Sequence, residues 1–329
     1  MHVAVCFNEV PPHLIRGEEA DRISEEGAAH EARQAAAALE GTGHAVSLVA
    51  LRDDLPAFIH VLQGLQADAV FNLCEGFWGD SHHEPHVAAV LELLGLPFTG
   101  SDLLTLALTQ RKPLTKILLE QHHLSTPSWM VVRRGERELS LARLSFPLIV
   151  KPAREDASLG IHLDNVVHTA EAAAEQILRV HQNYRQDALV EEFIAGREFN
   201  VPVLGDDPPQ VLPISEIRFD PAMPTPIVTY AGKWDEHSEE YLGTPPRCPA
   251  DLTSTEERVL TRAAVQAVRL CGCRDYARVD IRMRHGIPYI LEVNANPDIS
   301  PEAGFARCAR VHGLSYPDLI DTLLRQAAS

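Results

Sequence analysis

The chain has 329 residues, of which 45% are hydrophobic and 23% are charged, so it is an ordinary globular chain with room for two or three domains. A net charge of −17 with no basic cluster excludes nucleic acid and anionic membrane surfaces as favoured partners. The cysteines are scattered, which predicts reduced thiols. The chain opens without a basic and apolar leader and contains no apolar run long enough to span a membrane, so we expect a cytoplasmic protein.

Residues 1–108 predict an open, mostly parallel sheet covered by helices, because short apolar strands alternate there with helical segments. Strands are expected at 2–10, 44–51 and 68–76, and helices at 25–43 and 86–95. This stretch is expected to form a first domain.

The remainder is expected to form two further units, 109–195 and 196–329. The middle unit has a helix at 103–122 interrupted by Pro113, a turn at 125–129, a strand at 146–153, a helix at 169–181 and a strand at 187–194. The last unit contains strands, a proline-rich loop region at 213–250 and a long helix. Ser254 and Glu257 are expected to start that helix as a capping box, and Gly272 to end it.

The segment RVDIRMRHGIPYILEVNANPD, residues 278–298, gathers oxygen ligands on two neighbouring strands. Arg278, Asp280 and Arg282 share one face of the first strand, and Glu292 and Asn294 share one face of the second. A hairpin would bring the two carboxylates together, and hard oxygen ligands without His or Cys suit Mg²⁺. The alternative is a solvated strand face, which fits poorly with a Glu inside the apolar run YILEVNA.

Five blocks in order carry a family resemblance: LELLGLPFTGSD, FPLIVKPAREDASLGI, LVEEFIAGREFNV, YAGKW, and RVDIR with LEVNANPD. Together they resemble the ATP-grasp superfamily of ligases in its D-alanine–D-alanine ligase branch, across nearly the whole chain. The resemblance implies an α/β fold, α+β overall, in which ATP lies between the central and C-terminal domains.

The resemblance also implies the nucleotide contacts. Lysines 112 and 151 would touch phosphate oxygens, and REDASLG, which contains Ser158, would be a small-residue phosphate lid. Around the nucleoside, the family uses backbone near Glu192 and Ile194 for adenine, with the Glu191 side chain nearby, and Glu198 for the ribose hydroxyls. The alternatives are solvated surface lysines and a strand edge with a charged rim.

For the chemical step, the resemblance places Asp280, Glu292 and Asn294 as ligands of Mg²⁺ (or Mn²⁺). It places Arg278 where a fixed cation stabilises an anionic tetrahedral intermediate, with a salt bridge near Asp280 as the alternative. Lys233 would lie on a mobile loop that closes with the lid over the phosphates.

The amino-acid end departs from the family pattern. The N-terminal glycine-rich turn and its acid are missing, so Glu25 or Glu26 is the candidate for the first substrate's amine. Ala157 replaces the first lid serine and Trp234 the tyrosine after the loop lysine, while Asp298 and Ala303 replace a glycine and a carboxylate-binding serine near the acceptor. The resemblance thus keeps the ATP end and rewrites the substrate end.

These observations predict an ATP-dependent carboxylate–amine ligase that forms a dipeptide-like amide through an acyl phosphate, with an amino acid as donor. The alternatives are a divergent D-alanine–D-alanine ligase, an inactive nucleotide-binding regulatory protein, and a kinase of a polyanionic substrate, which the acidic charge disfavours. The partners expected are small carboxylates and amines, and the resemblance suggests a homodimer.

Two other features have alternative interpretations. The run DSHHEPH, with Asp80, His82, His83, Glu84 and His86, has the density of a transition-metal site, but a solvated turn at the start of a helix is preferred. Cys271 and Cys273 flank a glycine at a helix end, where buried thiols are expected rather than a redox pair.

Overall fold

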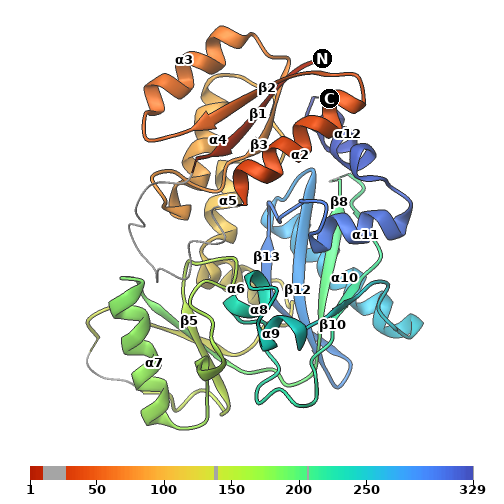
Figure 1. The fold of residues 1–329 in the computed structure, drawn as a ribbon. Coiled ribbons are helices and arrows are strands. Elements are labelled where there is room, and N and C mark those ends of the chain that lie inside the picture. The colour runs from red at the N-terminus through yellow and green to blue at the C-terminus, as the bar shows by residue number, and fades with distance from the viewer. Residues whose placement is uncertain (10–26, 137–139, 206, 329) are drawn as a thin grey trace.

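The computed structural model describes residues 1–9, 27–136, 140–205 and 207–328, and this part of the chain folds around three sheets (Figure 1). Glu25 and Glu26, the candidates for a substrate amine, lie outside the described residues. Within the described ranges, none of the helices combines the length and the apolar character that crossing a membrane requires.

The N-terminal sheet is parallel, in the order β2-β1-β3, with β1 (His2–Asn8), β2 (Ala45–Leu51) and β3 (Ala69–Leu73). Strands β1 and β3 are buried on both faces, which explains their nearly continuous apolar sequences, whereas the edge strand β2 is partly exposed. One face packs against α2 (Ala28–Gly41) and the C-terminal helix α12 (Tyr316–Ala327), and the other against α3 (Leu55–Leu65) and α4 (Glu84–Leu93) (Figure 1). The predicted parallel sheet is confirmed, but α3 was not predicted.

The helix expected at 103–122 is two helices, α5 (Leu103–Thr109) and α6 (Lys112–Gln121). Pro113 lies in the first turn of α6. Backbone N–H groups in the first turn have no partner within the helix, so a proline there costs no helical hydrogen bond. The prediction that Pro113 interrupts one helix is therefore wrong, since the break precedes it and Pro113 helps to start α6.

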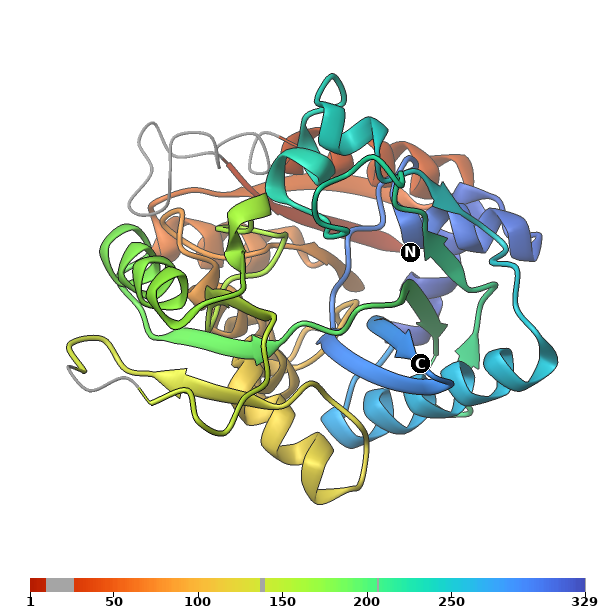
Figure 2. The same ribbon diagram turned by 90° about the horizontal axis from the view of Figure 1, so that it is seen from below.

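The middle sheet is antiparallel, in the order β4-β7-β5-β6. Its strands are β4 (Trp129–Val132), β5 (Leu148–Pro152), β6 (Val166–Val167) and β7 (Ala188–Glu192). A 3₁₀ turn, η3 (Leu163–Asn165), precedes β6, and α7 (Ala170–Asn183) covers one face, with Thr169 as its N-cap (Figure 2).

The C-terminal sheet runs β11-β10-β8-β12-β13, with β9 paired to β8. Its strands are β8 (Arg197–Leu204), β9 (Gln210–Val211), β10 (Ser215–Ile217), β11 (Pro246–Arg247), β12 (Tyr276–Arg284) and β13 (Ile287–Asn294). Helix α10 (Ser254–Cys271) packs against β8, β12 and β13 (Figure 2), and α11 (Gly304–His312) leads into α12.

Two predictions for this last region need correction. Residues 213–250 are not only loop, since they contain β10, β11 and the short helices α8 (Tyr230–Trp234) and α9 (Glu239–Leu242). The capping box of α10 is formed by Thr253 and Glu256, one residue before the predicted pair Ser254 and Glu257. The helix ends at Gly272, which has a left-handed φ of 76°, as predicted.

Candidate active site

The predicted hairpin is confirmed: β12 and β13 pair antiparallel, with Asp280 opposite Glu292 and Arg278 opposite Asn294. The turn consists of His285 and Gly286, both at positive φ, as a tight two-residue hairpin requires. The two carboxylates, twelve residues apart in the sequence, are thus cross-strand neighbours.

Asp280 is enclosed by hydrogen-bond donors. Arg278 donates from Nε and Nη2 to its two carboxylate oxygens at 2.7 and 2.8 Å. Asn200 donates to Oδ1 at 2.6 Å and Asn294 to Oδ2 at 3.1 Å. Burial raises the pKa of Asp280, and Arg278 opposes that shift. Arg278 thus forms the salt bridge expected as the alternative, and it also lines the cavity described below.

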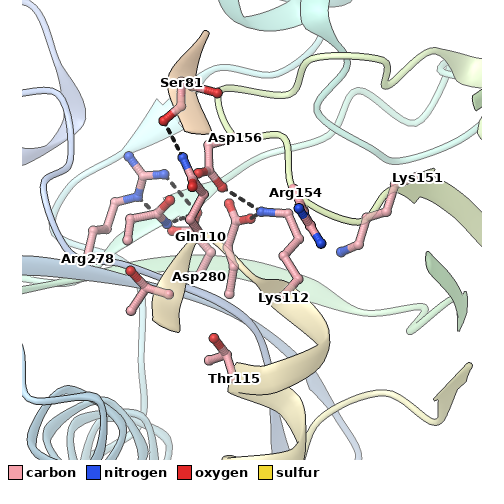
Figure 3. Close-up of polar contacts among 12 residues, drawn as sticks. Ser81, Gln110, Lys112, Thr115, Lys151, Arg154, Asp156, Arg278 and Asp280 are labelled. Atoms are coloured by element: carbon pink, nitrogen blue, oxygen red, sulfur yellow. Dashed lines mark hydrogen bonds and ion pairs between the residues drawn. The ribbon is translucent and has the colours of Figure 1, made fainter. Parts of the chain in front are cut away.

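Lys112, at the start of α6, connects the hairpin to the lid (Figure 3). Its Nζ lies 2.7 Å from Oε2 of Glu292 and 2.6 Å from Oδ1 of Asp156. Burial works to lower the pKa of Lys112, but the two carboxylates raise it above its usual value. Burial alone would likewise raise the pKa of Glu292, yet Lys112 and the nearby Lys151 hold it well below its ordinary value. Both groups are therefore charged at neutral pH.

A second ion cluster lies beside the first and joins α6 to the middle sheet. Glu191, on β7, forms ion pairs with Lys116 and, at 2.6 Å, with Lys151 on β5. Lys116 also donates to Thr126 Oγ1 at 2.7 Å. Burial lowers the pKa of Lys116 to about 8, against the pull of Glu191. Lys116 was missed by the sequence analysis, although its spacing of four from Lys112 puts both on one face of α6.

The residues implied for the nucleoside lie at the end of β7, in the connection after it and at the start of β8. Ile194 is buried, and Glu198 is buried in an ion pair with Arg282 at 2.7 Å. The side chain of Glu192 is turned elsewhere, because it accepts a hydrogen bond from the Ser145 backbone N–H at 2.9 Å. This leaves only the backbone of Glu192 for the role that the resemblance implies.

The lid and helix α8 are in contact. Three lid residues have left-handed backbones, namely Ala157, Ser158 and Gly160, with φ of 54°, 61° and 75°. The Trp234 indole Nε1–H donates to the Ala157 carbonyl at 3.0 Å, and the Tyr230 N–H to the Ile161 carbonyl at 2.9 Å. The Nζ atom of Lys233 lies 5.1 Å from the centre of the Trp234 ring. Burial lowers the pKa of this amine. The two segments predicted to close together are thus joined.

A cavity of about 540 Å³ opens between these groups and the N-terminal sheet. Its lining includes five residues predicted for the chemical step and the substrates, namely Lys233, Trp234, Arg278, Asn294 and Asp298, whereas Asp280, Glu292 and Ser158 are not among its lining residues. The N-terminal domain contributes further lining residues, among them Asn8, Glu75 and Glu84. The cavity therefore joins the predicted phosphate end to the predicted substrate end.

Sequence analysis missed the acidic side chains near Asp298. Burial raises the pKa of Glu31, on α2, and the charges of Asp298 and Glu75 raise it further. Burial also raises the pKa of Glu84, with Glu75 and Asp156 adding to the shift. Asp298 itself accepts a hydrogen bond from the Ser300 N–H at 2.8 Å. Acidic side chains from separate parts of the chain therefore gather around this end of the cavity, and only folding brings them together.

The remaining predicted features lie at a helix start and a helix end. Asp80 caps the 3₁₀ turn η2 (Ser81–His83) before α4. The Nδ1 atoms of His83 and His86 lie 3.3 Å apart. Over the described ranges, no group of three or more His, Cys, Asp or Glu side chains is placed to hold a metal ion. Cys271 and Cys273 are buried free thiols, as predicted.

Comparisons with known proteins agree over most of the chain. The family model described as D-ala D-ala ligase C-terminus matches residues 118–325. The uncharacterized protein y4sG of Sinorhizobium fredii is 38% identical over 78% of this chain and 73% of its own length. A D-alanine–D-alanine ligase of Cupriavidus metallidurans is 34% identical over 79% of this chain and 76% of its own.

A solved structure shares the fold. The D-alanine–D-alanine ligase from Bacillus anthracis, complexed with ATP, matches with a TM-score of 0.79 and 21% identity, covering 99% of this chain and 97% of that chain. This likeness confirms the fold that the sequence resemblance implied.

Proposed function

The chain belongs to the D-alanine–D-alanine ligase family, and from that premise we propose that it is an ATP-dependent ligase joining a carboxylate to an amine. The observation that carries the proposal is the cluster of Lys112 with Glu292 and Arg278 with Asp280 beside the cavity. In this proposal the cluster would supply cations for phosphate and oxygen ligands for a metal beside the cavity that would hold the substrates.

The proposed reaction has two steps. A substrate carboxylate oxygen attacks the γ-phosphorus of ATP, so that ADP leaves and an acyl phosphate forms. An amine then attacks the acyl carbon, and inorganic phosphate leaves with the carboxylate oxygen as the amide forms. Lys112 and Lys151 would hold phosphate oxygens, and Arg278 would face the oxyanion of the second step. The side chains position groups and balance charge, and none has to act as a nucleophile.

The oxygen atoms of Asp280, Glu292 and Asn294 fit Mg²⁺ or Mn²⁺, because two carboxylates and an amide are hard ligands that leave positions for phosphate oxygens and water. When bound, the metal would supply the positive charge that the phosphate groups of ATP require. Arg278 pairs with Asp280 and Lys112 pairs with Glu292, so each carboxylate has a cation beside it that favours the charged form a metal needs.

We infer an amino acid as donor, since the relatives named D-alanine–D-alanine ligase support amino-acid substrates. Those names also favour a second candidate, the joining of two D-alanines. Asp298 on the cavity wall and Ala303, which caps α11 without a side-chain hydrogen bond, argue against it, because the acceptor's carboxylate would meet an acid and no hydroxyl. A homodimer, a cytoplasmic location and the domains 1–108, 109–195 and 196–329 stay predictions.

The test is a screen for ADP release over pairs of L- and D-amino acids with Mg·ATP, with mass detection of the product. We expect a subset of pairs to give one amide per ADP, and Lys112→Met to abolish release with every pair. Nucleotide binding without ADP release from any pair would contradict the ligase and favour an inactive regulatory protein. Release of ADP with a phosphorylated product and no amide would favour a kinase.

A further inference from the structure

Arg282 is a buried arginine on β12 that the reaction just described does not use. It is 3% exposed and shares a face of the strand with Arg278 and Asp280. In the sheet it lies opposite Glu198 of β8. A guanidinium so deeply buried is costly unless all its surroundings compensate the charge, so its contacts indicate its role.

The first contact fixes the Glu198 carboxylate. Nε and Nη2 of Arg282 both lie 2.7 Å from the same oxygen, Oε2. Among the residues that the structure describes, the other oxygen, Oε1, has no hydrogen-bond partner. Because charge-assisted bonds from a planar fork hold a carboxylate in a defined orientation, Oε1 is presented in one direction with its acceptor capacity unused.

The second contact fixes the backbone after β7. Nη1 of Arg282 donates to the Ile194 carbonyl at 3.0 Å, and Nη2 donates to the Pro226 carbonyl. Ile194 is 2% exposed, and its N–H has no hydrogen-bond partner among the described parts of the chain. Buried backbone N–H groups are rarely left unpaired, so this one points to a ligand.

Two aromatic rings hold the guanidinium itself. The ring centres of Phe193 and Phe219 lie 4.7 and 5.3 Å from the Arg282 Cζ. Stacking restricts the rotation of the plane, so the fork that holds Glu198 and Ile194 is rigid. One side chain therefore sets the position of an unused acceptor and of an unused donor.

We propose that Arg282 is a positioning residue of the nucleotide site: it orients Glu198 Oε1 to accept a ribose hydroxyl and fixes Ile194 so that its N–H can donate to the base. This inference rests on the proposed function, because the roles of Glu198 and Ile194 come from the family resemblance. Arg282 is the last residue of the block RVDIR, but the resemblance gives it no role, and the role proposed here follows from its contacts.

The chain contains a matched control for a purely structural ion pair. Arg197, on β8 beside Glu198, donates to both oxygens of Glu216 at 2.7 and 2.9 Å and to the Asp251 carbonyl at 2.7 Å. Its Cζ lies 4.9 Å from the ring centre of Phe199. This arginine has the same kinds of partner as Arg282, but none of them is implied in nucleotide binding.

The experiment measures the affinity of Mg·ADP and of its 2′-deoxy and 3′-deoxy analogues by calorimetric titration. The proteins are the unmodified chain, Arg282→Met, Arg282→Lys and Arg197→Met. We expect the unmodified chain to bind ADP about tenfold more tightly than the analogue that lacks the hydroxyl held by Glu198. This ratio should fall toward one in Arg282→Met, take an intermediate value in Arg282→Lys, and persist in Arg197→Met.

Each of the other outcomes would contradict either the proposed function or the role of Arg282. No nucleotide binding by the unmodified chain would contradict the proposed function, not only the role of Arg282. Binding without discrimination by the unmodified chain, or discrimination that survives in Arg282→Met, would overturn the inference. Equal loss of discrimination in Arg197→Met would show a general effect of breaking an arginine–glutamate ion pair in this sheet. If Arg282→Met does not fold, Arg282→Lys decides by the same ratio.

Discussion

At the scale of single residues, Asp280 and Glu292 each hold a protein cation where the proposed function puts metal and phosphate. Removing one partner of a buried ion pair leaves the other charge uncompensated, so conservative amides are the appropriate substitutions. Asp280→Asn and Glu292→Gln keep the size and shape of the side chains and remove the charge. Because both oxygens of Asp280 accept hydrogen bonds, Asp280→Asn also loses the contacts made to one of them.

Both substitutions are expected to reduce substrate-dependent ADP formation at least about a hundredfold with the fold intact, because a neutral amide cannot balance a metal bound to phosphate. ADP release at saturating Mg²⁺ measures the loss, and urea unfolding checks the fold. Glu216→Gln, which alters another buried carboxylate of the same sheet, is the control and should retain activity. Full activity in both site variants would contradict the metal assignment.

The pKa of Lys116 gives a prediction about stability and pH. The buried amine titrates at about 8 instead of 10.5, so between these values the unfolded chain binds more protons than the folded one. The free energy of unfolding contributed by Lys116 therefore rises with pH in this window. Relative to Lys116→Met, the unmodified protein should gain on the order of 1 kcal/mol from pH 7 to pH 9 in urea unfolding. A constant or decreasing difference would rule out a lowered pKa.

Asp298 is expected to select the acceptor. At a fixed donor, D-alanine should react at least about tenfold more slowly than an acceptor with a masked carboxylate or a second amino group, because like charges repel in a partly dry cavity. In Asp298→Gly the rate with D-alanine should come closer to the rate with the better acceptors. Initial rates of amide formation with each acceptor, in both proteins, measure this change. D-alanine matching the best acceptor in the unmodified protein would show that Asp298 has no such effect.

At the scale of elements, the contact between the lid and α8 is the one most directly tied to the chemistry. The Trp234 indole bonds the lid backbone at Ala157, and closing both segments over an acyl phosphate would keep water from hydrolysing it. Trp234→Phe keeps an aromatic ring and removes only the N–H donor.

Trp234→Phe is therefore expected to raise the ratio of ADP released to amide formed, since a looser lid admits water. Trp129→Phe is the control, because Trp129 also donates an indole N–H, to Glu120 at 2.9 Å, away from the lid. Parallel measurement of ADP and amide in the same reaction gives the ratio. An unchanged ratio in Trp234→Phe would show that the contact does not seal the site.

Elements with a clear period and clear stop signals could be predicted from the sequence. Strand β1, helix α7 and the β12–β13 hairpin were found for this reason. Helix α3 was missed because it ends at Gln66, a left-handed residue that is neither Gly nor Asn. Strand β4 was missed because four residues are too few to show a period.

At the scale of the whole molecule, the site is assembled from distant segments. Local spacing predicted the pairing of Asp280 with Glu292, because a hairpin brings residues together that are close in sequence. The contact of Lys112 with Glu292, 180 residues apart, could be inferred only through the family resemblance. The contacts of Asp156 with Lys112 and of Arg282 with Ile194 join residues of separate segments to which the resemblance assigns no mutual contact, so only the folded chain reveals them.

The same reasoning applies to the substrate end. The cavity is lined by the ends of β1 and β13, the lid, α8 and the segment before α4, which the fold brings together around one space. Its acids come from separate parts of the chain, so the sequence indicated that this end differs from the family pattern but not that so many acidic side chains gather there.

The central claim is that an amide forms through an acyl phosphate, and isotope transfer tests it most directly. A donor amino acid labelled with oxygen-18 in its carboxylate is incubated with acceptor, Mg·ATP and the protein, and the phosphate and amide are analysed by mass spectrometry. We predict one labelled oxygen in the phosphate for each amide formed, because the carboxylate oxygen that attacks the γ-phosphorus leaves with the phosphate. Amide formed alongside unlabelled phosphate would contradict this mechanism.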